Sequence, residues 1–267
     1  MSRSRSVDLV AESFHDTQLL RFEELDGIPG FAHCITTRPW NMATHRGEFC
    51  EHAAERREMV CRRLGLSFSN LTAADQVHSP HVLRVRAEDV GSGRMDRATA
   101  MKFTDGLVCD LPDVPLIQFS ADCPLVLAVD PRRGAVGTAH ASWRGTVTSI
   151  SAELIRMMQK QFGTRAADLV VAICPCAGPE EYEVGPEIQR IAEARLGDVA
   201  GFFPSRNGRL YFDMRGANVG QLVAGGVAPE RILVARASTM SDRHFYSHRM
   251  DGPDTGRFAV IAGFRRG

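Results

Sequence analysis

Apolar residues along this chain recur at two spacings, one typical of helices and the other of buried strands. Within 144–163, four apolar residues stand at the spacing of one helical face: Val147, Ile150, Leu154 and Met158. The segment ends in a glycine, a common terminator of helices. Helices are predicted in the same way over 51–66, 185–197 and 214–226.

Short apolar runs predict buried strands between these helices. In 114–131, two such runs are separated by a polar break from Ser120 to Pro124. The break predicts either two strands or one kinked strand, with Cys123 inside the break. Further strands are predicted over 81–90, 134–141, 167–174, 231–239 and 257–264.

The order of these segments predicts the domain organisation. Strands and helices alternate through the second half of the chain without an internal repeat or a low-complexity linker. A chain of 267 residues can bury a sizeable core. We therefore predict a single layered α/β or α+β domain over 18–267. Residues 1–17 begin with a run of serine and arginine and are predicted to form a flexible N-terminal extension.

Charge and hydropathy argue against several classes of function. Lysine plus arginine and aspartate plus glutamate both number 32, so no net charge favours nucleic acid or an anionic membrane. The sequence has no apolar run long enough to cross a membrane, and its polar start lacks the apolar core of a signal peptide. We therefore expect a cytoplasmic protein. Its seven cysteines are an odd number, which argues against a disulfide framework, and the missing C-x-x-C pair argues against a zinc ribbon or a thioredoxin-like redox pair.

The densest group of chemically active side chains is GTAHASWRGTV, residues 137–147, which holds His140, Trp143 and Arg144. It lies where a predicted strand passes into a predicted helix, and backbone N–H groups at a helix start bind anions. Arg144 adds a planar guanidinium suited to phosphate or carboxylate, and Trp143 could stack on a base or a sugar. The alternative is structural, with Trp143 in the core and Arg144 paired with a carboxylate.

Five blocks, in order along the chain, add a resemblance to a known family: DQVHS, ADCPLV, AHASWRG, ICPCAGPEEYEVG and FYSHRMDGPDTGR. Together they resemble the successive signature blocks of the YfiH family, also called the laccase-domain or polyphenol oxidase family. The resemblance extends from about residue 31 to residue 261. It implies a layered α-β-β-α sandwich, similar to the fold of cysteine hydrolases related to bacterial deamidating toxins.

The resemblance also implies a zinc site. The family's ligands correspond here to the histidine of DQVHS, the cysteine of ADC and the first histidine of AHASWRG, which are His78, Cys123 and His140. Taken singly, His78 or Cys123 reads as an ordinary structural residue. Three such ligands leave the fourth position of tetrahedral zinc open, as in catalytic sites, and zinc lowers the pKa of bound water to about 7. Copper is the less favoured metal, because none of the nine histidines forms an H-x-H pair.

The activity implied by the resemblance is purine nucleoside chemistry. It comprises phosphorolysis of adenosine, inosine, guanosine and 5′-methylthioadenosine to the base and ribose 1-phosphate, together with deamination of adenosine. Purine nucleosides and phosphate are the expected ligands. Cys123 and His140 are the candidate catalytic groups, and Arg144 is the candidate phosphate ligand. Trp143 or Tyr182 would flank the purine base.

Three other functions stay open. Cys123 could be a nucleophile activated by His140 in an amide hydrolase that edits peptidoglycan precursors. The zinc could instead stabilise a non-catalytic interaction module, with a fourth ligand such as His81 closing the site. The third is a copper polyphenol oxidase, against which the missing H-x-H pairs argue.

The sequence departs from the YfiH blocks at a few positions. One of them is beside the proposed site, where Ser142 replaces the family's glycine.

Overall fold

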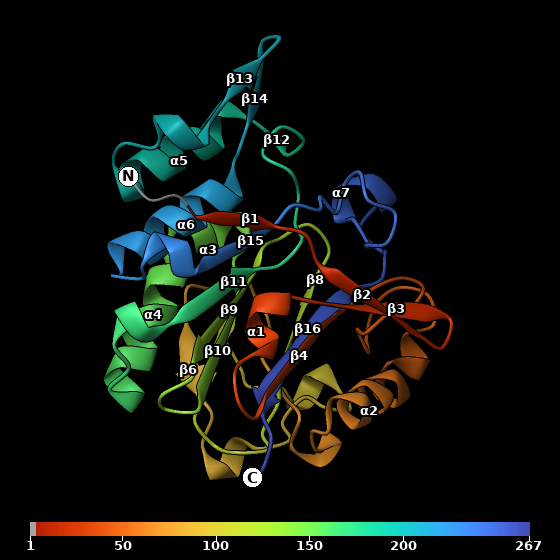
Figure 1. The fold of residues 1–267 in the computed structure, drawn as a ribbon. Helices are drawn as coiled ribbons and strands as arrows, with labels where there is room; N and C mark the ends of the chain where they lie inside the picture. The colour runs from red at the N-terminus through yellow and green to blue at the C-terminus, as the bar shows by residue number, and fades with distance from the viewer. Residues whose placement is uncertain (1–3) are drawn as a thin grey trace.

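The computed structural model describes residues 4–267, whose strands form two large sheets and one small sheet (Figure 1). The seven-stranded sheet has, in spatial order, β1 Arg5–Val7, β15 Ile232–Ala235, β11 Val170–Ile173, β9 Leu125–Asp130, β10 Ala135–His140, β7 Gly106–Cys109 and β6 Val82–Arg84. The six-stranded sheet has β2 Val10–Phe14, β3 Thr17–Arg21, β4 Phe31–Thr36, β16 Phe258–Phe264, β8 Leu116–Ser120 and β5 Thr72–Ala73. The small sheet has β12 Glu183–Val184, β14 Arg209–Tyr211 and β13 Ser205–Arg206.

Helices cover the outer faces of the two large sheets. The helices are α1 Glu23–Asp26, α2 Ala53–Leu64, α3 Trp143–Val147, α4 Ile150–Phe162, α5 Pro186–Leu196, α6 Met214–Ala224 and α7 His248–Asp251. Figure 1 shows α2 beside the six-stranded sheet and α4 on the far side of the seven-stranded sheet. No helix in residues 4–267 combines the length and the apolar character that crossing a membrane requires.

The buried residues confirm a four-layer α-β-β-α arrangement. Between the sheets, Leu127 of β9 belongs to the same apolar cluster as Val260 of β16. On the outer face of the seven-stranded sheet, Ala128 clusters with Leu154 of α4. Because neighbouring residues of a strand point to opposite faces, the continuous apolar run of β9 serves both layers.

The core helices and strands agree with the hydrophobic pattern. The polar break in 114–131 separates two strands, β8 and β9, which belong to different sheets. The helix predicted over 144–163 is interrupted, because Ser149 has φ +63° and the chain divides there into α3 and α4. The strand predicted over 81–90 is confined to β6.

The N-terminal segment differs from the prediction of a flexible extension. β1 pairs in parallel with β15, and β2 pairs antiparallel with β3, so the segment adds strands to both large sheets. The apolar side chain of Val7 is buried in the core between the sheets. Edge pairing of this kind comes from long-range backbone hydrogen bonds, which polar composition does not report. Residues 1–3 of the predicted extension lie outside the described residues.

Candidate active site

A cavity of about 480 Å³ lies where the chain crosses between the two large sheets. One crossing connects β5 to β6 and carries His78, and the other connects β8 to β9 and carries Cys123. His140, the last residue of β10, lines the same cavity. The volume is within the range of small-molecule sites, so three residues far apart in sequence share a ligand-sized space.

Cys123 is held in a tight turn between β8 and β9. Ser120 Oγ donates to the carbonyl oxygen of Cys123 at 2.6 Å. The preceding residue, Asp122, has φ +94°, a conformation that non-glycine residues rarely adopt. Its buried carboxylate accepts hydrogen bonds from Thr239 Oγ1 and from the backbone N–H of Arg249, both at 2.7 Å. These contacts maintain the strained turn that directs Cys123 to the cavity.

His140 is buried and oriented by a carboxylate. Its Nδ1 lies 2.9 Å from Oδ1 of Asp105, whose side chain is fully buried. With Nδ1 engaged, Nε2 is the ring nitrogen left for a further partner. Burial lowers the pKa of His140, but hydrogen bonds and charges of Cys123 and Asp105 outweigh it and raise the pKa to about 9.

The same carboxylate shapes the loop that carries His78. Asp105 accepts the backbone N–H groups of Val77 at 3.0 Å, His78 at 3.0 Å and Ser79 at 2.7 Å. His78 itself has φ +63°, so the loop needs these bonds to keep its conformation. The rings of His78 and His140 have centroids 5.2 Å apart. Partial burial and the neighbouring His140 lower the pKa of His78 to about 4, so the ring is neutral near pH 7.

The chemistry of these donors fits zinc. A thiol and two imidazoles are typical zinc ligands, and the Asp105–His140 contact is the carboxylate–histidine pair that usually orients a metal-bound imidazole. As the side chains lie, however, no three His, Cys, Asp or Glu residues within 4–267 are arranged to hold a metal ion. The set His78, Cys123 and His140 therefore stays a prediction that needs side-chain rotation to form a site.

The segment after His140 lies outside the lining of the cavity. Neither Trp143 nor Arg144 is among the residues that line the cavity. The Arg144 guanidinium instead lies over the Trp143 ring, 4.2 Å from its centroid, and Trp143 packs against an apolar cluster beside α5. At the start of α3, Ser142 Oγ accepts the N–H of Gly145 at 3.1 Å, so this helix start bonds to its own cap.

Tyr182, the other aromatic candidate for the purine base, lines the cavity. It directly precedes β12 and lines the cavity together with Arg249 of α7. The Arg249 guanidinium lies 4.7 Å from the centroid of the Tyr182 ring. His81, the candidate fourth ligand, is not a lining residue.

Sequence reasoning missed the two aspartates that organise the site. Asp105 directly precedes β7, and Asp122 directly precedes Cys123. A lone aspartate next to a buried apolar strand was the available signal, because a carboxylate needs compensating donors there. It also missed the positive wall of the cavity, formed by residues from separate segments: His45, Arg46, Arg97 and Arg257.

Comparisons with known proteins cover nearly the whole chain. A family model described as "Multi-copper polyphenol oxidoreductase laccase" matches residues 34–265. The chain is 32% identical over 229 residues to the purine nucleoside phosphorylase YlmD of Geobacillus stearothermophilus, covering 84% of this chain and 83% of that protein. It is 32% identical over 243 residues to a purine nucleoside phosphorylase of Deinococcus radiodurans, covering 88% and 89% of the two chains.

A relative with a different name and a solved structure complete the comparison. Adenosine deaminase RL5, from an unknown prokaryotic organism, is 29% identical over 225 residues, which are 81% of this chain and 84% of that protein. The crystal structure of YlmD from Geobacillus stearothermophilus superposes with a TM-score of 0.87 at 28% identity, covering 97% of this chain and all of that chain. The two chains thus share one fold over nearly their whole length.

Proposed function

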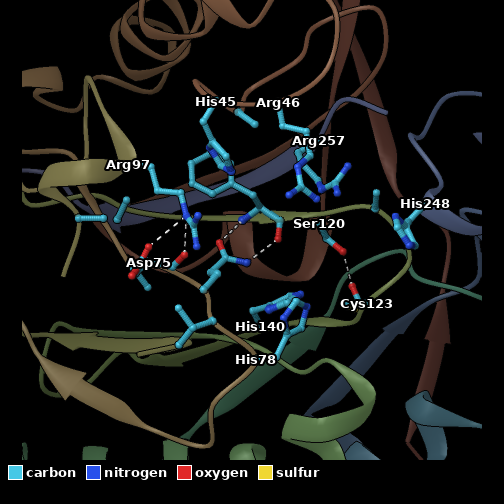
Figure 2. Close-up of a pocket in the computed structure, with 18 of the residues that line it drawn as sticks. His45, Arg46, Asp75, His78, Arg97, Ser120, Cys123, His140, His248 and Arg257 are labelled. Carbon is cyan, nitrogen blue, oxygen red and sulfur yellow. Dashed lines mark hydrogen bonds and ion pairs between the residues drawn. The ribbon is translucent and has the colours of Figure 1, made fainter. Parts of the chain in front are cut away.

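This chain belongs to the YfiH family of laccase-domain proteins, and from that premise we propose that it is a purine nucleoside phosphorylase with adenosine deaminase activity. The names of its relatives support an enzyme acting on purine nucleosides. The structural observation that carries the proposal is the cavity itself, which has His78, Cys123 and His140 on one wall and guanidinium groups on the other (Figure 2).

The chemistry of phosphorolysis matches a cavity with two such walls. A phosphate oxygen forms a bond to C1′ of the ribose while the bond from C1′ to the purine nitrogen breaks. The electron pair of the broken bond leaves with the purine, which takes up a proton. Cationic donors are needed where the phosphate binds, and a group that holds a proton is needed near the purine. His140 is not assigned to the second task, because Asp105 engages its Nδ1 and the proposed zinc would take its Nε2.

Tyr182 is the aromatic candidate for the purine base. Its ring lines the cavity and is covered on one side by the Arg249 guanidinium. An aromatic face suits a planar base, because stacking buries apolar area on both rings. Trp143 and Arg144 lie outside the cavity lining, so the base-flanking role belongs to Tyr182 in this proposal.

Zinc is part of the proposal, with His78, Cys123 and His140 as its ligands. A zinc ion bound there would supply a Lewis acid and an open coordination position for substrate or water. In deamination, water takes the place of phosphate as the second substrate, and ammonia leaves from C6 of adenine. One cavity can therefore serve both reactions, because they share the nucleoside and differ in the second substrate.

The test combines product identification with metal analysis. Adenosine is incubated with the purified protein with and without phosphate, and the products are separated. We expect adenine and ribose 1-phosphate with phosphate, inosine and ammonia without it, and about one zinc per chain. If the zinc-loaded protein forms neither set of products, the proposal is wrong.

One observation favours a second function, a cysteine-type amide hydrolase. Asp105, His140 and Cys123 form a chain of contacts in which the carboxylate orients the imidazole and the imidazole contacts the thiol. A metal chelator separates the two functions. Nucleoside turnover should be lost on chelation, whereas a thiol hydrolase should survive chelation and be inactivated by iodoacetamide.

A further inference from the structure

The cavity has a positively charged wall whose role the sequence did not predict, although Arg257 ends the block FYSHRMDGPDTGR. We call it the arginine wall, and it consists of His45, Arg46, Arg97 and Arg257. In Figure 2 these side chains lie across the cavity from His78 and His140. They come from the loop after β4, from the segment between β6 and β7, and from the loop before β16. Only the folded chain brings them together.

One buried side chain fixes the two loops of the arginine wall. Asn41 is fully buried, and its Nδ2 donates to the carbonyl oxygen of Arg46 at 2.6 Å. Its Oδ1 accepts the backbone N–H of Arg257 at 2.9 Å. A single amide thereby joins the backbones of the two arginines, so the fold fixes where both side chains start.

A close backbone approach brings the same loops into contact. Gly47 has φ +79°, and a Cβ added to it would lie 2.7 Å from the Cα of Gly256. Only glycine avoids that overlap while keeping the left-handed conformation. The neighbours of these glycines in sequence are Arg46 and Arg257, so the approach holds the two arginines at one site.

The charges on this wall are only partly neutralised. Arg97 pairs with Asp75, with 3.0 Å between Nε and Oδ1. The nearby Arg57 is buried and donates to the carbonyl oxygens of Met42, Gly93 and Arg94. Within the described part of the chain, neither Arg46 nor Arg257 forms an ion pair with a carboxylate.

The positive charge of the arginine wall also affects the pKa of His45. Partial burial together with the charges of Arg97, Arg46 and Arg257 lowers the pKa of His45 to about 4. The imidazole is therefore neutral near pH 7 and offers one N–H donor and one acceptor. Arg257 Nη1 also donates to two carbonyl oxygens of its own loop. The guanidinium groups of Arg46 and Arg257, together with a neutral imidazole, form a donor set suited to an anion with several oxygens.

We propose that the arginine wall is the binding site of a phosphate group, with Arg46 and Arg257 as its charged ligands. This inference rests on the proposed function and replaces Arg144 as the phosphate ligand. The geometry places the phosphate across the cavity from His78, Cys123 and His140. A ribose between the two walls would then present C1′ to the phosphate oxygen and its base to the opposite side.

A phosphate group could reach this wall from two sources. It could be inorganic phosphate, the nucleophile of phosphorolysis, or the 5′-phosphate of a nucleotide. Both offer the same oxygens to the guanidinium groups. Inorganic phosphate and AMP are therefore tested separately, with adenosine as the ligand without a phosphate group.

The experiment measures binding and turnover in Arg46→Gln and Arg257→Gln. Calorimetric titration with inorganic phosphate should show affinity reduced at least about tenfold in both variants, as expected for loss of a charge-assisted hydrogen bond. The KM for phosphate should rise by a similar factor while the KM for adenosine changes less than about twofold. Arg190→Gln, an exposed arginine on α5 outside the cavity, is the matched control and should behave as the parent protein.

The outcomes separate this inference from the proposed function. Unchanged affinity for both inorganic phosphate and AMP in correctly folded Arg46→Gln and Arg257→Gln would overturn the site. A loss of phosphate affinity found instead only in Arg144→Gln, measured in parallel, would also overturn it. If Arg257→Gln fails to fold, Arg46→Gln, on an exposed residue, decides alone. Weaker AMP binding with unchanged inorganic phosphate binding would assign the wall to a nucleotide. If phosphate binding depends on Arg46 and Arg257 but no ribose 1-phosphate forms, the phosphorylase proposal fails and the site stands.

Discussion

His140 is hydrogen-bonded to the buried carboxylate of Asp105, with 2.9 Å between Nδ1 and Oδ1. The same carboxylate accepts three consecutive backbone N–H groups of the loop that carries His78. One acidic side chain therefore positions both histidines of the proposed metal set. Removing its charge should act on two proposed ligands at once.

Asp105→Asn tests this arrangement. The substitution keeps the size of the side chain but removes the charge and one acceptor, so His140 and the His78 loop lose their common anchor. We expect zinc affinity to fall about 10- to 100-fold, the range typical for loss of such a partner of a metal-bound histidine. Competition with a chromogenic chelator measures it directly. Asp110→Asn, on an aspartate that pairs with Arg84 away from the cavity, is the control. Parental zinc affinity in Asp105→Asn would contradict the role.

The metal set itself is tested by His78→Ala combined with His140→Ala. We expect the double variant to lose stoichiometric zinc and nucleoside turnover while retaining the secondary structure of the parent. The ligands lie on loops and at a strand end, so the two cores between and outside the sheets remain intact. Metal analysis by mass spectrometry and far-ultraviolet circular dichroism provide the two readouts. Persistence of both zinc and turnover would show that the ligand assignment is wrong.

Gly47→Ala tests how tightly the arginine wall is built. The added methyl group would lie 2.7 Å from Gly256 Cα, and the left-handed conformation would add about 1 kcal/mol of strain. We expect a loss of stability larger than that strain and a higher KM for phosphate. Gly208→Ala is the matched control, because Gly208 has φ +74° but no atom within 4 Å of an added Cβ. Urea unfolding compares the two, and equal losses of stability would mean that the approach to Gly256 does not matter.

The buried His33 predicts a pH dependence of stability. Burial, with a smaller effect of Arg21, lowers the pKa of His33 from 6.5 to about 4. Between these values the unfolded chain binds a proton that the native chain does not, so stability present above pH 6.5 is lost as pH falls towards 4. Over this pH range, His33 should lower the free energy of unfolding by about 3 kcal/mol.

His33→Gln should flatten the pH dependence in that window. Gln can still accept the N–H of Phe22, which His33 Nε2 accepts at 2.9 Å, but it cannot titrate. The difference in free energy of unfolding between parent and variant is measured by urea unfolding from pH 7 to pH 4. His52→Gln, on an exposed histidine, is the control. A parental slope in His33→Gln would remove His33 as the cause.

Much of the secondary structure is determined locally by the sequence. The apolar run after Pro124 becomes β9, and the helical spacing from Ile150 to Met158 becomes α4, because each pattern matches the period of the element it forms. The five sequence blocks identify the family and contain the three proposed zinc ligands. All three ligands line one cavity. These features follow from residues that are close in sequence or match a family pattern.

The tertiary structure decides what depends on distant partners. β1 pairs with β15, a strand more than 200 residues later in the chain. Asp105, which the sequence did not single out, contacts the ring of His140 and the backbone of His78. The arginine wall likewise needs Asn41 to join Arg46 to Arg257. Composition and periodicity report only the local environment of each residue. Hydrogen bonds and charges that join segments far apart exist only once the layers have packed, and they decide where a phosphate can bind.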